Sequence, residues 1–270
     1  VRNRRTVAIV TGNAPESGML LWGLVNAEVR RALGDMFAGD VSMPPVVVYS
    51  LPEMGLSMDL DLREDTTRAA LMAAVDKACI GGAGIVAIAC NTTQYFSPEI
   101  ERECGKWGVD YVSIHSALSR YLRESRIRIA RLAGIGHVAD MESERSVLAG
   151  SVGTVQMMPY EKEEILRIEE IAYAFKARTK SVNALTQQLK AILQRPDPIK
   201  AKRPLPVVLA LTELSLLLNA RGVLHGEQGG SSLLADREVI DTMSVLALEI
   251  ARRYLRINGD MTGSDSAHSV

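Results

Sequence analysis

Short apolar, β-branched runs alternate with longer segments of helical periodicity along the whole of this 270-residue chain. The first such run, Thr6–Thr11, is followed by a helix-period segment, and the pattern then repeats. This alternation is typical of parallel sheets, because each parallel connection needs a crossover long enough to hold a helix. The sequence therefore predicts an α/β fold.

The expected elements fall into two halves. The first half predicts strands at Thr6–Thr11, Val46–Ser50, Ile85–Cys90 and Val109–Ile114 and helices at Pro15–Leu33, Arg63–Ile80 and Pro98–Lys106. The second half predicts strands within Arg128–Gly136 and at Thr154–Met157 and Val207–Leu211, and helices at Met141–Gly150, Glu161–Lys176, Ser181–Leu193 and about Asp236–Leu255. A strand thus runs into a small hydroxyl residue twice, at Cys90-Asn91-Thr92 and at Leu211-Thr212-Glu213.

This repetition predicts two pseudo-symmetric lobes, each a mostly parallel sheet flanked by helices, with the active site between the lobes. Ligands of open α/β sheets bind at the carboxyl ends of the strands. We expect an N-terminal lobe over residues 1–115, which includes part of the closing C-terminal helix, and a C-terminal lobe over 116–257. Residues 258–270 are rich in Ser, Asp and Gly and are expected to be disordered.

Composition excludes several classes of function. The formal net charge is −1 and the basic residues are spread along the chain, so no basic face predicts nucleic-acid binding. The apolar runs end well before the roughly 18 residues needed to span a membrane. No signal-peptide pattern follows the basic first residues, and the expected location is the cytoplasm.

The three cysteines, Cys79, Cys90 and Cys104, have no metal-ligand spacing and are expected to be free thiols. Cys79 and Cys104 lie in helical patterns and are expected to be structural or merely exposed. The four histidines do not pair with one another or with a cysteine, and the glycines form no nucleotide-binding motif. The sequence therefore predicts no metal and no cofactor.

Cys90 is the strongest catalytic candidate. It ends an apolar strand, and the Asn91-Thr92-Thr93 stretch after it can start a helix, whose N-terminus favours a thiolate and attracts an anionic substrate group. The competing interpretation is a small apolar residue that closes a core strand.

Several motifs, in order along the chain, resemble the aspartate/glutamate racemase superfamily of cofactor-independent enzymes with two α/β lobes. Ala89-Cys90-Asn91-Thr92-Thr93 resembles the first Cys-Asn-Thr element of that family, and Leu211-Thr212-Glu213-Leu214 resembles its second, usually Cys-Thr-Glu. Thr11–Glu16 resembles the opening turn, and Ile240-Asp241-Thr242 resembles the start of the last helix. The resemblance covers nearly all of the chain except the tail, and it implies a homodimer.

The resemblance implies that two thiols flank the substrate carbon, one removing a proton and the other supplying one to the opposite face. It assigns Asn13, Asn91 and Thr92, together with Thr212, to the cradle of the substrate carboxylate, where charge collects as the proton leaves. Helix capping and turn formation are the alternative roles for these residues.

Position 211 departs from the family, because leucine stands where the second cysteine belongs and cannot exchange a proton. Thr212, Glu213 and His225 are the candidates to replace it, the last in a glycine-rich loop over 221–232 that could close over the cleft. Helix capping or an ion pair is the alternative role for Glu213, and a surface loop position is the alternative for His225.

A second departure concerns substrate choice. Aspartate-type members carry an arginine shortly after the second strand, where this chain reads Tyr49–Met54. Arg63 could substitute, and Lys176 resembles a family lysine that contacts the distal group of the substrate. The alternative role for both is a solvated helix charge.

The predicted function is therefore that of a racemase or isomerase that moves a proton at the carbon alpha to a carboxylate, with Cys90 as the acid and base. The expected partner is a small carboxylate or amino-acid substrate. Two alternatives stay open: a one-cysteine decarboxylase or isomerase of the same superfamily, and a homologue that binds a ligand without catalysis.

Overall fold

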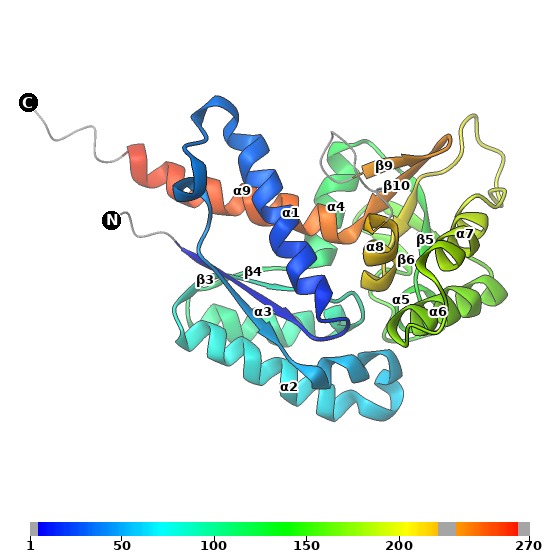
Figure 1. Cartoon of the computed structure of the whole chain (residues 1–270), viewed down its shortest axis with the longest axis horizontal. Coiled ribbons are helices and arrows are strands. Elements are labelled where there is room, and N and C mark those ends of the chain that lie inside the picture. The colour runs from blue at the N-terminus through cyan, green and yellow to red at the C-terminus, as the bar shows by residue number, and fades with distance from the viewer. Residues whose placement is uncertain (1–4, 221–230, 264–270) are drawn as a thin grey trace, which may run out of the picture.

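The computed structural model describes residues 5–220 and 231–263 and contains two mostly parallel sheets flanked by helices (Figure 1). The prediction of an α/β fold with two lobes is confirmed. His225 and most of the predicted loop over 221–232 lie outside the described residues, as does the end of the predicted tail beyond Gly263.

The first sheet has four parallel strands in the order β2-β1-β3-β4. Its strands are β1 (Thr6–Thr11), β2 (Val46–Ser50), β3 (Ala83–Ile88) and β4 (Asp110–Val112), and its covering helices include α1 (Glu16–Leu33), α2 (Leu60–Ile80) and α3 (Ser97–Lys106). Alternate residues of β1 face opposite sides, since Val7 and Ile9 pack toward α1 whereas Ala8 and Val10 pack toward α2 and α3. Burial of both faces explains the nearly continuous apolar sequence of the central strands β1 and β3.

Four short 3-10 helices connect elements of this lobe: η1 (Gly34–Met36), η2 (Gly39–Ser42), η3 (Pro52–Asp59) and η4 (Thr92–Phe96). The last two follow β2 and β3 directly. They therefore lie at the carboxyl edge of the first sheet, where a ligand of this fold class is expected.

The second sheet has six strands in the order β6-β7-β5-β8-β10-β9. Its centre is parallel, and antiparallel pairs lie at both edges. The strands are β5 (Ile129–Ala133), β6 (Gly150–Val152), β7 (Val155–Pro159), β8 (Val207–Leu209), β9 (Ser231–Leu234) and β10 (Arg237–Asp241). The helices of this part are α4 (Ile114–Glu124), α5 (Gly136–Ala139), α6 (Lys162–Lys176), α7 (Val182–Leu193) and α8 (Thr212–Asn219). Leu118 and Leu122 of α4 pack in the core of this sheet.

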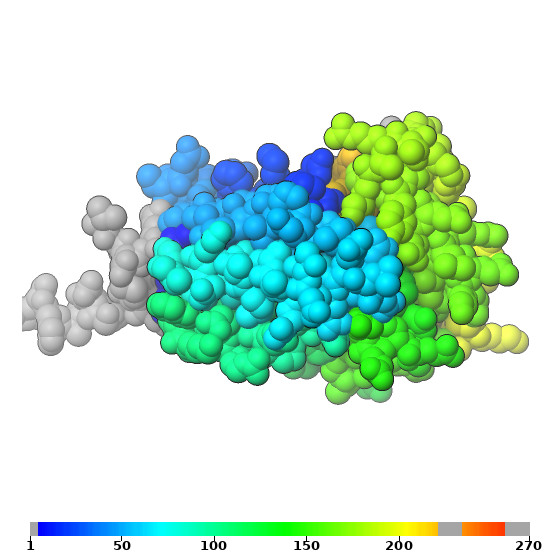
Figure 2. Space-filling view, turned by 90° about the horizontal axis from the view of Figure 1, so that it is seen from below, coloured from blue at the N-terminus to red at the C-terminus, as the bar shows by residue number. Residues whose placement is uncertain are grey.

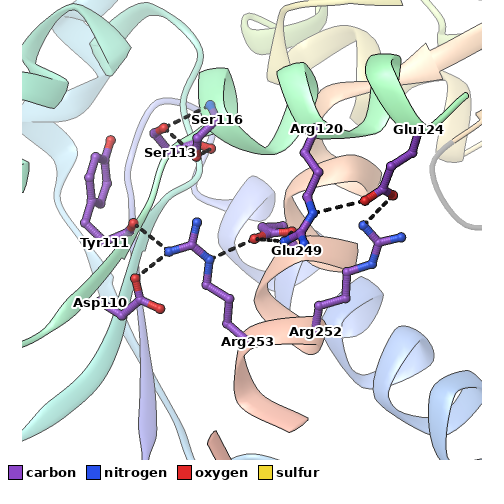
Figure 3. A network of polar contacts seen from close by, with 9 residues as sticks. All are labelled: Asp110, Tyr111, Ser113, Ser116, Arg120, Glu124, Glu249, Arg252 and Arg253. Carbon is purple, nitrogen blue, oxygen red and sulfur yellow. Dashed lines mark hydrogen bonds and ion pairs between the residues drawn. The ribbon is translucent and has the colours of Figure 1, made fainter. Parts of the chain in front are cut away.

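The last helix, α9 (Thr242–Gly263), begins at the end of β10 but packs against the first sheet. Its apolar face, including Leu246 and Ile250, joins the core formed by α1 and β1. Figure 3 shows the polar side of this packing, where Arg253 pairs with Asp110 and Glu249 accepts from Arg120 at 3.1 Å. The helix thus ties the two sheets together through both apolar and charged contacts.

The predicted helix over Met141–Gly150 is wrong, because this segment forms turns and the start of β6. The Asp140 side chain accepts from the backbone N–H of Glu142, a local bond that competes with helix formation. Arg145 instead extends toward α2, where it pairs with Asp61 and Glu64.

The closing helix begins later than predicted. The segment Arg237–Asp241 is strand β10, which pairs in parallel with β8, and the helix starts at Thr242. Asp241 accepts from the backbone N–H groups of Met243 and Ser244 and so caps the new helix. Helix α4 was not predicted; the Ser113 hydroxyl caps it by accepting from the N–H of Ser116.

The two parts meet along a continuous boundary, visible in Figure 2 where the cyan surface of α2 adjoins the green surface of the second part. Tyr173 of α6 donates to Asp59 across this boundary at 3.0 Å. Among the described residues, no helix combines the length and the hydropathy of a membrane span.

Candidate active site between the two sheets

The turn after β1 holds Asn13 in the interior. Gly12 has a φ of 145°, and a Cβ there would lie 1.8 Å from the carbonyl oxygen of Leu51, so only glycine fits. Ala14 follows with a φ of 55°, which is rare for a residue with a side chain. This constrained turn leaves Asn13 buried and pointed at β3.

Cys90 lies two residues beyond the end of β3 and has no exposed surface. Its Sγ is 3.7 Å from Nδ2 of Asn13 and 3.7 Å from Oγ of Ser57. Strand β3 ends at Ile88, before its predicted end at Cys90. The helix that follows Cys90 is the short 3-10 helix η4, and α3 starts only at Ser97. The carbonyl oxygen of Cys90 accepts from Gln94 at 3.1 Å, which fixes the backbone there.

The second sheet repeats this arrangement at Leu211. The backbone N–H of Ala89 donates to Val10 at 2.8 Å, and the N–H of Ala210 donates to Ala133 at 2.8 Å. Cys90 follows Ala89, and Leu211 follows Ala210. Leu211 therefore occupies in the second lobe the position that Cys90 occupies in the first. Leu211 is buried and precedes α8, which begins at Thr212.

Lys176, at the end of α6, joins the two lobes. Its Nζ donates to Oδ1 of Asn13 at 2.6 Å and lies 3.7 Å from Oε1 of Glu213. Because Asn13 in turn contacts Cys90, a continuous polar chain runs from Cys90 through Asn13 and Lys176 to Glu213. The predicted residues Cys90, Asn13, Lys176 and Glu213 are thus brought together.

Glu213 is a buried acid whose charge is only partly compensated. Burial raises the pKa of its carboxyl above the usual range, and the nearby Lys176 opposes this shift. Thr212 donates its hydroxyl to Oε2 of Glu213 at 3.1 Å. In the structure Thr212 is therefore a hydrogen-bond donor to the carboxylate of Glu213.

Several polar atoms of the site are buried and lack a hydrogen-bond partner among the described residues. They are both amide atoms of Asn91, the hydroxyl of Thr92 and Oε1 of Glu213, the last of which faces Lys176. Buried polar groups without partners are costly and commonly mark a functional site. Asn91 and Thr92, which directly follow Cys90, thus have buried polar groups whose hydrogen bonds the described residues do not supply.

Sequence reasoning missed Ser57 and Gln94, both of which contact Cys90. Ser57 comes from η3, the segment after β2 where the family resemblance led us to look for an arginine. Met58 of the same segment places its sulfur 3.3 Å from Nζ of Lys176. Arg63 is exposed on α2, where it interrupts the helical geometry. Gln94 directly follows the Asn91-Thr92-Thr93 stretch, and this position beside the motif could have indicated that it belongs to the site.

A cavity of about 690 Å³ adjoins this cluster and is shared by the two lobes. Gly12 and Ala14 form one wall, and Lys176 forms part of the other. Cys90 does not line this cavity, and Asn13 and Lys176 connect it to the sulfur through side-chain contacts. Among the described residues, no cluster of three His, Cys, Asp or Glu side chains is arranged to hold a metal ion.

No protein-family model matches the chain, and a search of curated proteins finds no match. Solved structures with the same fold include proteins described as aspartate or Asp/Glu racemases. An Asp/Glu racemase candidate from Yersinia pestis superposes with a TM-score of 0.69 and 17% identity, covering 93% of this chain and 99% of its own. At this identity the likeness shows the shared fold alone.

Two further structures agree. An aspartate racemase homologue from Pyrococcus horikoshii gives a TM-score of 0.60 at 17% identity, with 94% of this chain and 98% of its own covered. The aspartate racemase of Picrophilus torridus gives 0.60 at 13% identity, with coverages of 93% and 94%. The fold that the sequence motifs implied is therefore confirmed, whereas the catalytic roles stay predictions.

Proposed function

We propose that the protein catalyses cofactor-independent proton transfer at the carbon next to a carboxylate, as a racemase or isomerase with Cys90 as the acid and base. The polar chain from Cys90 through Asn13 and Lys176 to Glu213 carries this proposal, since it spans both lobes. Groups that can move a proton, the thiol of Cys90 and the carboxyl of Glu213, thus lie at the two ends of one chain of side-chain contacts. The shared fold with aspartate racemases supports it.

In the proposed reaction the Cys90 thiolate removes the α-proton and becomes a thiol, while the electron pair of the C–H bond passes into the carboxylate. The amide of Asn91 and the hydroxyl of Thr92 stabilise the added charge, because both are buried and have no hydrogen-bond partner in the described part of the chain. Donors of this kind typically contribute about 2.7–4 kcal/mol each to the transition state.

The opposite face of the carbon requires a second proton donor, and Leu211 cannot supply one. We assign this role to Glu213, with Thr212 and Lys176 holding its carboxyl in place. A carboxyl with a raised pKa retains its proton at higher pH than an exposed one and is suited to act as an acid. The proton passes from Glu213 to the carbon, and the thiol of Cys90 returns its own proton in the reverse direction.

The presence of leucine at the position equivalent to Cys90 favours one alternative, a one-cysteine decarboxylase. In that reaction the bond from the α-carbon to a second carboxylate breaks, CO2 leaves, and the electron pair stays on the α-carbon. The thiol of Cys90 then donates the single proton required, and no group on the opposite face takes part.

The test is a panel of D- and L-amino acids and 2-substituted malonates in deuterated water, with wild type and Cys90→Ala. Inversion with deuterium uptake supports the racemase, uptake with retention supports one-sided isomerisation, and CO2 release from malonates supports the decarboxylase. Cys104→Ala is the matched control, since Cys104 is also a buried free thiol but lies on α3 beside Cys79 of α2. Wild-type turnover in Cys90→Ala would overturn the proposal, and ligand binding without turnover in wild type would indicate a binding protein.

A further inference from the structure

The cavity beside the polar chain has a more apolar lining than the chain of contacts from Cys90 to Glu213. Its walls come from the turn after β1, the end of α6, the start of α7 and the outer face of α8. Half of the twelve wall residues have apolar side chains: Ala14, Pro15, Phe175, Val182, Leu216 and Ala220. Its volume of about 690 Å³ falls in the range of roughly 300–1,000 Å³ that is typical of small-molecule sites.

Lys176 is the lining residue that connects this cavity to the proposed reaction centre. Its side chain forms part of the cavity wall, and its ammonium group contacts both Asn13 and Glu213. The cation is therefore already engaged by an amide oxygen and a buried carboxylate. A short acidic side chain such as that of aspartate would have to compete with both partners for it.

The rim of the cavity is cationic. Arg178 and Lys180 lie there with one acid, Glu16, whose carboxylate is 3.8 Å from the Arg178 guanidinium. The hydroxyl of Ser181 caps α7 at the same rim by accepting from the N–H of Ala184. Two cations against one carboxylate favour an anionic group at the outer end of a bound molecule.

We propose that this cavity holds the side chain of the substrate, and that the substrate is a carboxylic acid with a large apolar substituent that ends in an anionic group. This inference rests on the proposed function, because it places the reacting carbon between Cys90 and Glu213. The apolar arm then passes Lys176 and packs against Phe175 and Leu216, and its end meets the rim at Arg178. Aspartate, which lacks such an arm, leaves the apolar walls without contact.

The experiment measures binding and α-proton exchange separately, using 4-carboxyphenylalanine, phenylalanine and aspartate as probes in both enantiomers. Binding is measured as thermal stabilisation of Cys90→Ala, and exchange is measured on wild type. We expect stabilisation to be greatest with 4-carboxyphenylalanine and least with aspartate, with exchange efficiency, kcat/KM, in the same order and at least about tenfold between the extremes.

Two variants localise the effect. Leu216→Trp fills the cavity and is expected to weaken binding of both aromatic probes at least about tenfold while leaving aspartate unchanged. Leu166→Trp, on the exposed side of α6, is the matched control and should change nothing. Arg178→Ala should reduce the preference for 4-carboxyphenylalanine over phenylalanine by about two- to fivefold, as expected for an exposed charge.

The outcomes separate this inference from the proposed function. Absence of stabilisation by the aromatic probes, or an equal effect of Leu216→Trp on all probes, overturns the substrate assignment even if aspartate exchanges its proton. Stabilisation that Leu216→Trp removes, in a wild type without any exchange or CO2 release, supports the cavity assignment and overturns the proposed catalysis.

Discussion

The ammonium group of Lys176 lies 2.6 Å from Oδ1 of Asn13, so the end of α6 in one lobe reaches the turn that holds the cysteine contact in the other. This hydrogen bond joins residues 163 positions apart in the sequence. It also leaves the lysine close enough to Glu213 to offset part of the buried negative charge.

Replacing Lys176 with methionine should lower kcat/KM for the best substrate by about 100-fold or more, because Asn13 loses its donor and Glu213 loses its cation. Lys162→Met, an exposed lysine at the other end of α6, is the control and should retain wild-type activity. Steady-state kinetics check both. An unchanged rate in Lys176→Met would remove the lysine from the mechanism.

Glu213→Gln should alter how stability depends on pH. Burial raises the pKa of Glu213, so the folded protein holds a proton that the unfolded chain releases above its ordinary pKa of 4.5. Wild-type stability should therefore fall, relative to Glu213→Gln, as the pH rises from about 4.5 through the raised value. Urea unfolding of both proteins between pH 4 and pH 8 measures this difference, and a constant difference across that range would contradict it.

Thr92→Val should stabilise the free protein while weakening activity. The Thr92 hydroxyl is buried without a hydrogen-bond partner among the described residues, so an isosteric methyl group removes a desolvation cost of about 1 kcal/mol or more. Thr212→Val is the contrasting variant, because it removes the bond to Glu213 and should destabilise. Chemical denaturation and kinetics on both proteins test the pair. Destabilisation by Thr92→Val would show that this hydroxyl has a structural role.

Gly12→Ala should destabilise the fold by more than about 1 kcal/mol, because the added Cβ would lie 1.8 Å from the carbonyl oxygen of Leu51 at a φ of 145°. Gly105→Ala in α3 is the control, since a Cβ there meets no atom within 4 Å. It should be neutral or stabilising by up to about 1 kcal/mol. The urea midpoints of the two variants check the contrast, and equal midpoints would be inconsistent with the constrained turn.

Leu211→Cys should introduce a thiol at the position equivalent to Cys90 and raise the rate of inversion at the α-carbon. The variant exchanges a buried side chain for a smaller one, with an expected cost of a few kcal/mol. Leu211→Ala opens similar space without a thiol, so faster inversion in Leu211→Cys alone would support the assignment. Equal rates in both variants would argue that space, and not a second thiol, controls the reaction.

Much of the sheet architecture follows directly from the sequence. The apolar runs at Thr6–Thr11 and Val46–Ser50 form β1 and β2 with the predicted bounds, because short runs rich in β-branched residues favour strands. The ends of strands were harder to place. The runs before Cys90 and Leu211 stay apolar for two residues past the last ladder position, since these residues are buried in the connection itself.

The wrong and missing predictions for β10 and Ser57 have one physical cause, which is that contacts between distant parts of the chain determine their structure. Val239 and Ile240 have helix-compatible neighbours, but pairing with β8 makes them part of a strand. Ser57 could not be assigned to the site from its local sequence, because its contact with Cys90 depends on where η3 lies relative to the segment after β3. The motif residues Asn13 and Cys90 lie close together for the opposite reason, because parallel strands bring their carboxyl ends to one edge whatever the intervening sequence.

Complete burial of the Cys90 sulfur isolates any hydrogen that it accepts. In the proposed reaction that atom would stay out of contact with solvent until the lobes part, and it could return to the carbon from which it came. A substrate deuterated at that carbon would then keep part of its label in ordinary water. The retained fraction would compare the lifetime of the closed enzyme with the speed of the chemical step.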